Sequence, residues 1–101
     1  MYSTHYAKPE DELFEILFTI GKNIYNQEHY YHSVYFLEKI VLLNCENLNI
    51  KNFTVKLLST SYFIIGEFKK CHDLLEKYLP QFLNQEDNLE KYNCLYLLTI
   101  F

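Results

Sequence analysis

Histidines are the side chains in this sequence best suited to bind a metal ion. His29 and His32 would lie one turn apart on a helix, and His72 falls in the equivalent part of a later segment. A zinc site needs three or four ligands held close together, and no third ligand stands near this pair. Histidines on the outer surface of a helix explain the pattern better, so we expect no metal site.

Clustered carboxylates are the next candidates, because paired acids perform general acid–base catalysis. Two clusters are present: Glu10, Asp11, Glu12 and Glu15, and then Glu86, Asp87 and Glu90. Both precede apolar periodic segments, so helix capping and the helix dipole account for them. No GxSxG or HExxH motif occurs, and two glycines are too few for a phosphate-binding loop. We therefore expect no catalytic residue, no cofactor and no small-molecule substrate.

The composition favours one small intracellular domain. Nine lysines and no arginine are spread along a chain of net charge -4, so the basic stripe of a nucleic-acid-binding protein is missing. Cys45, Cys71 and Cys94 are far apart in helical patterns, as expected for reduced, buried thiols. The sequence shows no signal peptide and no apolar run of about 18 residues. We expect a soluble protein that binds neither nucleic acid nor a membrane.

Apolar periodicity predicts an all-α chain. Acidic residues after Pro9 indicate the start of the first helix, and residues 26–28 interrupt its apolar stripe. Further helices are predicted at about 29–45, 53–65, 68–79 and 89–101. Residues 44–52 should form a polar connection. Pro80 should end or kink the fourth helix, with a linker at 81–88.

Two of these helical hairpins are related by a constant offset of 38 residues. The pairs are Leu17 and Val55, Ile20 and Leu58, Gly21 and Ser59, Ile24 and Tyr62, Tyr30 and Phe68, Ser33 and Cys71, and Leu37 and Leu75. Small residues are expected where two helices approach closely, with large residues beside them. The sequence is rich in Asn, Lys, Ile, Tyr and Phe and holds one Ala, as an AT-rich gene would produce. Ser and Cys are therefore expected in place of Ala. We predict that the packing residues are Leu17, Ile20, Gly21, Ile24, Tyr30, Ser33, Leu37, Leu58, Ser59, Tyr62, Gly66, Phe68, Cys71 and Leu75.

The recurring order of large, small and aromatic side chains along these helices is typical of tetratricopeptide-like repeats. We predict a single domain over 1–101 that is a fragment of a right-handed α-solenoid. Repeat one is expected at about 10–45, repeat two at about 53–80, and the first helix of a third repeat at about 89–101. The usual period is about 34 residues, so the extra residues are placed in the connection at 44–52. So few repeats predict more chain or a partner. The alternative is an ordinary antiparallel helical bundle whose repeat is accidental.

Lysine and asparagine side chains offer one candidate binding site for a peptide carboxylate, of the kind found in tetratricopeptide co-chaperones. The residues are Lys22, Asn23, Asn52, Lys56 and Lys91. Both residue types are abundant throughout the chain and any solvated surface needs them, which favours a plain surface. A generic peptide-binding or co-chaperone-like adaptor is the alternative function.

From Tyr31 onward the chain resembles the amino-terminal repeats of subunit six of the anaphase-promoting complex, a tetratricopeptide scaffold of the cell-division-cycle type. Three blocks carry the likeness: YHSVYFLEKIV at 31–41, the run at 57–77, and NCLYLLT at 93–99. Where the family has Ala, this chain has Val34, Leu58, Ser59, Cys71, Leu98 and Thr99, and its Arg is replaced by Leu95. The sibling subunit three has a related arrangement.

The resemblance implies a non-catalytic scaffold of a ubiquitin ligase that controls mitosis, in the nucleus and cytoplasm. In that family the amino-terminal repeats form a homodimer, and grooves of the solenoid hold other subunits of the complex. It therefore implies protein contacts through Tyr31, Val34, Tyr35, Leu57, Thr60, Ser61 and Phe63. A helical RNA-binding repeat would instead need a basic groove, which this acidic chain lacks.

Overall fold

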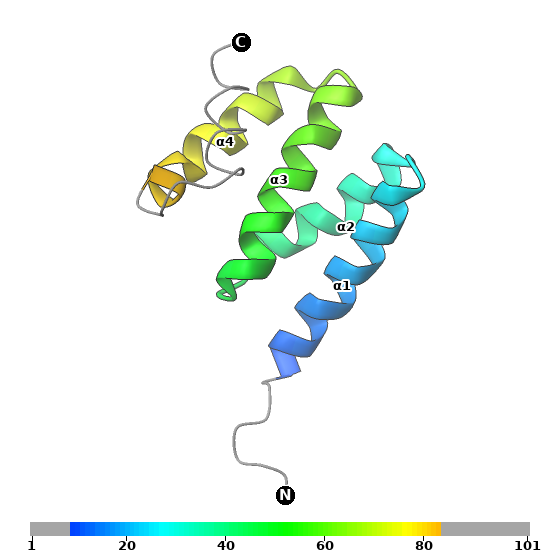
Figure 1. The fold of residues 1–101 in the computed structure, drawn as a ribbon, viewed down its shortest axis with the longest axis vertical. Coiled ribbons are helices and arrows are strands. Elements are labelled where there is room, and N and C mark those ends of the chain that lie inside the picture. The colour runs from blue at the N-terminus through cyan, green and yellow to red at the C-terminus, as the bar shows by residue number, and fades with distance from the viewer. Residues whose placement is uncertain (1–8, 84–101) are drawn as a thin grey trace, which may run out of the picture.

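The computed structural model describes residues 9–83, which form four α-helices and no strand. They are α1 (Pro9–Asn26), α2 (Tyr30–Leu42), α3 (Leu48–Ile64) and α4 (Phe68–Leu83) (Figure 1). Helices that are consecutive in the chain pack together, and α3 also contacts α1. The predicted all-α class is thus confirmed for this part of the chain. The predicted helix at 89–101 lies outside the described residues.

All three connections between these helices begin with the same backbone turn. Each contains one residue in the left-handed conformation: Glu28 with φ 65°, Asn44 with φ 57°, and Gly66 with φ 85°. The next amide N–H donates to a carbonyl five residues earlier, over 3.1 Å from His29 to Ile24, 3.4 Å from Cys45 to Ile40, and 2.8 Å from Glu67 to Tyr62. This Schellman motif satisfies carbonyl groups that a helix end leaves without partners.

The turns after α1 and α3 share most of their backbone hydrogen bonds at the offset of 38 residues. Glu28 donates to Tyr25 over 2.9 Å, and the equivalent Gly66 donates to Phe63 over 3.2 Å. The helices that follow also open alike, because Ser33 and Cys71 each donate to the carbonyl four residues earlier over 3.0 Å. The spacing found in the side chains is therefore present in the backbone.

Glu28 and Gly66 allow a paired test of backbone strain at equivalent turns. A left-handed conformation costs an ordinary L-residue about 1 kcal/mol or somewhat more, and glycine is largely spared this cost. Glu28→Gly should therefore raise the free energy of unfolding by about 1 kcal/mol. Gly66→Ala should lower it by about 1 kcal/mol. No atom lies within 4 Å of the Cβ that this second substitution would add, so the loss comes from the backbone alone. Urea denaturation followed by circular dichroism measures both changes, and effects of the same sign would contradict the prediction.

Several predicted helix boundaries are wrong. α3 begins at Leu48 rather than near residue 53, because the side chain of Asn47 accepts a hydrogen bond from the N–H of Ile50 over 3.1 Å and caps the helix. The connection is therefore 43–47, not 44–52, and the extra residues of the repeat lengthen a helix. α2 is also shorter than predicted, with His29 before it and Cys45 after it.

Pro80 does not end α4, which continues to Leu83, so residues 81–83 do not belong to a linker. A proline inside a helix costs about 3 kcal/mol, since it removes one hydrogen bond and crowds the preceding turn. The two turns before Pro80 are anchored by the buried side chains of Leu74, Leu75 and Tyr78. Their burial offsets this cost.

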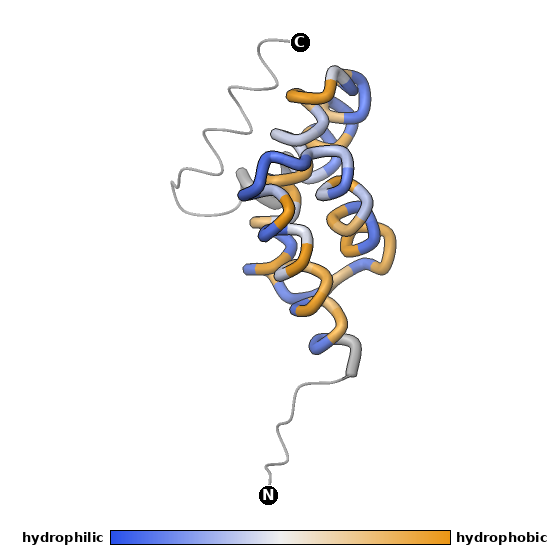
Figure 2. The backbone as a smooth tube through the Cα atoms, turned by 90° about the vertical axis from the view of Figure 1, so that its right-hand side faces the viewer, coloured by the Kyte–Doolittle hydropathy of each residue, from blue (hydrophilic) through white to orange (hydrophobic). Residues whose placement is uncertain are grey.

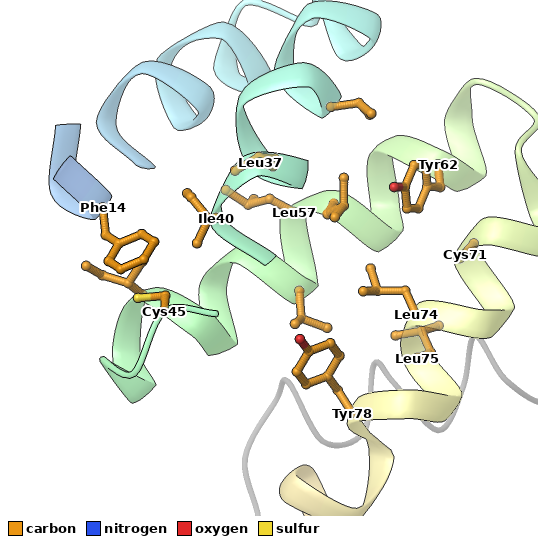
Figure 3. Packing of buried hydrophobic residues seen from close by; sticks show 14 residues of the cluster. Phe14, Leu37, Ile40, Cys45, Leu57, Tyr62, Cys71, Leu74, Leu75 and Tyr78 are labelled. Atoms are coloured by element: carbon orange, nitrogen blue, oxygen red, sulfur yellow. The ribbon is translucent and has the colours of Figure 1, made fainter. Parts of the chain in front are cut away.

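The core lies where the helices meet. Apolar and polar stretches are interspersed along the backbone (Figure 2). Leu37 of α2 is 0% exposed, and Leu57 of α3 points toward Leu37 and Ile40 (Figure 3). Gly21 lets α1 approach α2 closely, because an added Cβ would lie 2.9 Å from Cδ2 of Leu37. The hydroxyl of Ser33 donates to the carbonyl of Gly21 over 3.0 Å. The equivalent residues of the second hairpin are also buried: Ser59, Cys71 and Leu75.

The predicted packing residues differ in how much of their surface is exposed. Eight are buried: Gly21, Ser33, Leu37, Leu58, Ser59, Tyr62, Cys71 and Leu75. Leu17, Ile24 and Tyr30 are half-buried, whereas Ile20, Gly66 and Phe68 are exposed, so these last three do not belong to the buried core. Gly66 serves the turn, and Phe68 begins α4, with its ring 5.5 Å from that of Phe63. Ile20 is 37% exposed, so neighbouring residues cover it only in part.

Candidate protein-interaction surfaces

The predicted contact residues include three that are buried. Val34, Leu57 and Ser61 cannot serve as surface contacts, because α2 and α3 turn these positions toward neighbouring helices. The hydroxyl of Ser61 donates to the carbonyl of Leu57 over 2.8 Å, which satisfies it inside the protein. Tyr31, Tyr35 and Phe63 are exposed and Thr60 is half-buried.

Tyr31 and Tyr35 lie one turn apart on the outer side of α2, with 71% and 59% of their surfaces exposed. The ammonium group of Lys39 stands 4.5 Å from the centre of the Tyr35 ring, a cation–π contact. Leu42, 81% exposed, continues the same side of the helix. We call these four residues the α2 surface. It combines aromatic, aliphatic and cationic groups, a mixture common at protein interfaces.

The half-buried side chain of Thr60 also makes hydrogen bonds within the protein. Its hydroxyl donates to the carbonyl of Lys56 over 2.9 Å, and its side chain is hydrogen-bonded to Tyr25 of α1. Burial raises the pKa of Tyr25, the nearby Tyr30 raises it further, and the Thr60 hydrogen bond opposes both. Thr60 therefore joins α1 to α3. Close by, the rings of Phe18 and Phe53 lie 6.2 Å apart between the same helices.

A groove of about 390 Å³ separates α2 from α4. Its lining residues are Glu38, Val41, Leu42, Leu58, Tyr62, Lys70, Asp73, Leu74 and Lys77. The hydroxyl of Tyr62 donates to the carboxylate of Glu38 and links α3 to α2. Burial and the adjacent Glu38 carboxylate raise the pKa of Tyr62 far above its usual value, so the phenol stays protonated at neutral pH. The pair is suited to hold helices together and not to transfer protons.

An exposed apolar stripe runs along α1, and it includes Ile20, which the sequence predicted to be a packing residue. Leu13, Ile16 and Ile20 form it, and we call it the α1 surface. One hollow of about 520 Å³ beside it is lined by Glu12, Glu15, Ile16, Thr19 and Ile20. Another of about 670 Å³ is lined by Asp11, Leu13, Phe14, Leu43, Asn44, Glu46 and Asn47.

The remaining candidate residues from the sequence are spread over several elements. Lys22 and Asn23 are exposed on α1, Asn52 and Lys56 are half-buried on α3, and Lys91 lies outside the described residues. The His29 and His32 rings are 6.3 Å apart. Across residues 9–83, no three His, Cys, Asp or Glu side chains are grouped to hold a metal ion. Cys45 and Cys71 are buried thiols, and burial raises the pKa of Cys45.

Of the helices described, none is both long and apolar enough to cross a membrane. Comparison of the chain with protein-family models, with curated proteins and with solved structures finds no match.

Proposed function

We propose that this chain is a non-catalytic protein-interaction scaffold built from tetratricopeptide-like hairpins. The recurrence of a whole hairpin at an offset of 38 residues, with equivalent buried side chains and the same opening of the helix after the turn, carries the proposal. It is supported by the buried set of Gly21, Ser33 and Leu37, which recurs as Ser59, Cys71 and Leu75. The first helix of the second hairpin, α3, contacts both helices of the first. Stacking of this kind builds extended surfaces on which other proteins bind.

Within this class, we propose an amino-terminal part of an anaphase-promoting complex scaffold subunit that pairs with a second copy of itself. The three sequence blocks support the family, and the exposure of Tyr31 and Tyr35 within the first block supports the contact. Large aromatic side chains lose little conformational entropy on binding and contribute strongly at interfaces. The α2 surface is therefore the proposed dimer contact. Such a subunit would act in the nucleus and cytoplasm through the shape and apolar contacts of its repeats.

Sedimentation equilibrium of the whole chain tests the dimer. The wild type should associate with increasing concentration, and Tyr35→Glu should remain monomeric, because the variant loses the aromatic contact and adds a charge whose desolvation opposes association. Asn49→Glu adds the same charge at an exposed position of α3 and should still dimerise. A wild-type chain that stays monomeric at every concentration would contradict the homodimer. Binding of an acidic carboxy-terminal peptide that is lost in Lys56→Ala would support the adaptor function instead.

A further inference from the structure

Two of the three residues of the α1 surface, Ile16 and Ile20, occupy positions whose equivalents in the second hairpin are buried. The hollow beside this surface is lined by five residues. Four of them, Glu12, Ile16, Thr19 and Ile20, correspond at the offset of 38 to Ile50, Thr54, Leu57 and Leu58. All four counterparts are buried in α3, which contacts α1 and α2. On α1 the equivalents remain open, with Ile16 56% and Ile20 37% exposed. The α1 surface thus has the form of a helix-packing face that the described helices cover only in part.

Charge distinguishes the α1 surface from its counterpart on α3. Glu12 replaces Ile50, and Glu15 replaces Phe53. The adjoining hollow, between the start of α1 and the connection at 43–47, adds Asp11 and Glu46. Among the described residues that line the two hollows, four are carboxylates and none is a lysine. A positively charged occupant complements this border.

The same charges argue against a second copy at this position. Two α1 surfaces facing each other would bring like carboxylates together, and like charges across an interface cost binding energy. A helix with apolar side chains along one side and lysine or arginine along its edges meets both requirements. It would pack on Leu13, Ile16 and Ile20 and place its cations opposite the acidic border.

We propose that the α1 surface binds a basic amphipathic helix of another protein. This inference rests on the proposed function as a scaffold and adds to it a binding site and a chemical class of partner. Binding follows the helix-in-groove mode, in which apolar residues spaced three and four apart serve as anchors. The site is separate from the α2 surface, which lies on a different helix.

Fluorescence anisotropy of the whole chain with two labelled helical peptides tests the proposal. Both peptides carry the same leucine stripe, and the flanking residues are lysine in one and glutamate in the other. The lysine peptide should bind about tenfold more tightly or better, with an affinity that falls as salt is added. Ile16→Gln with Ile20→Gln should weaken its binding by about tenfold, and Glu12→Gln with Glu15→Gln by several-fold. These positions are on the surface, and circular dichroism checks that the variants fold.

Tyr35→Gln is the matched control, since it makes the same kind of change on the α2 surface and should leave peptide binding unchanged. Equal affinities for the two peptides, or binding that survives Ile16→Gln with Ile20→Gln, would overturn the proposal. The proposal would also be overturned if the wild-type chain dimerised and this double variant did not, because the α1 surface would then be the contact between two copies of the chain. If the chain stays monomeric but binds the lysine peptide, only the homodimer proposal is contradicted. If the chain neither dimerises nor binds the peptide, both proposals are contradicted.

Discussion

Replacing Leu37 with alanine should lower the free energy of unfolding by about 3 kcal/mol. The side chain is fully buried, and Leu57 points toward it from the neighbouring helix. Truncation removes its burial and leaves a cavity that fixed helices close only in part. Urea denaturation followed by circular dichroism measures the loss as a lower midpoint with an unchanged slope.

Leu42→Ala is the control for this prediction, because it makes the same chemical change in the same helix at a side chain that is 81% exposed. Its effect should stay within about 0.5 kcal/mol. Leu75→Ala, at the equivalent buried position of the second hairpin, should resemble Leu37→Ala. Similar losses at Leu37 and Leu42 would mean that the described packing of α2 is incorrect.

Gly21→Val should cost about 3 kcal/mol for the opposite reason, an excess of volume. The first added carbon would already lie 2.9 Å from Cδ2 and 3.1 Å from Cγ of Leu37. Leu37 is fully buried, so either its side chain must repack within the core or α1 and α2 must separate. Valine is a better helix former than glycine, but that gain is only a few tenths of a kcal/mol. Thermal and urea denaturation should both show the loss.

Thr19→Val places the same side chain in α1 at an exposed position. It should leave the free energy of unfolding within about 0.5 kcal/mol of the wild type. If Gly21→Val were equally mild, the close approach of α1 and α2 at Gly21 would be excluded. Substitution at Gly21 by serine, the residue at the equivalent Ser59, should fall between the two.

The spacing of side chains predicted much of the fold. Proline followed by acidic residues located the start of α1, because those residues suit the first turn of a helix. The polar break after Tyr25 located the turn before α2. The small residues at the repeat offset, Gly21, Ser33 and Ser59 among them, lie in buried positions between helices. Local propensity and helical period are sufficient for such features.

Properties that depend on neighbouring helices were not predictable in this way. α3 contacts α1, α2 and α4, so most of its circumference is buried, and Leu57 and Ser61 cannot be surface contacts. Ile20 and Leu58 share a pattern, but Ile20 is 37% exposed and Leu58 only 1%, because α3 contacts three described helices and α1 contacts two. The early start of α3 depends on the capping hydrogen bond that the Asn47 side chain accepts. This asparagine lies in a polar stretch of sequence, where nothing marks it as the cap.

The position of α3 has a consequence for the order in which the described helices come apart. α3 is the one described helix that contacts each of the other three, whereas α4 contacts only α3 among them. α4 can therefore detach while the remaining three helices keep their mutual contacts, but the loss of α3 leaves α4 with no described neighbour. During synthesis α1 and α2 can pair as soon as both have emerged, and α3 must follow before α4 has a surface on which to fold.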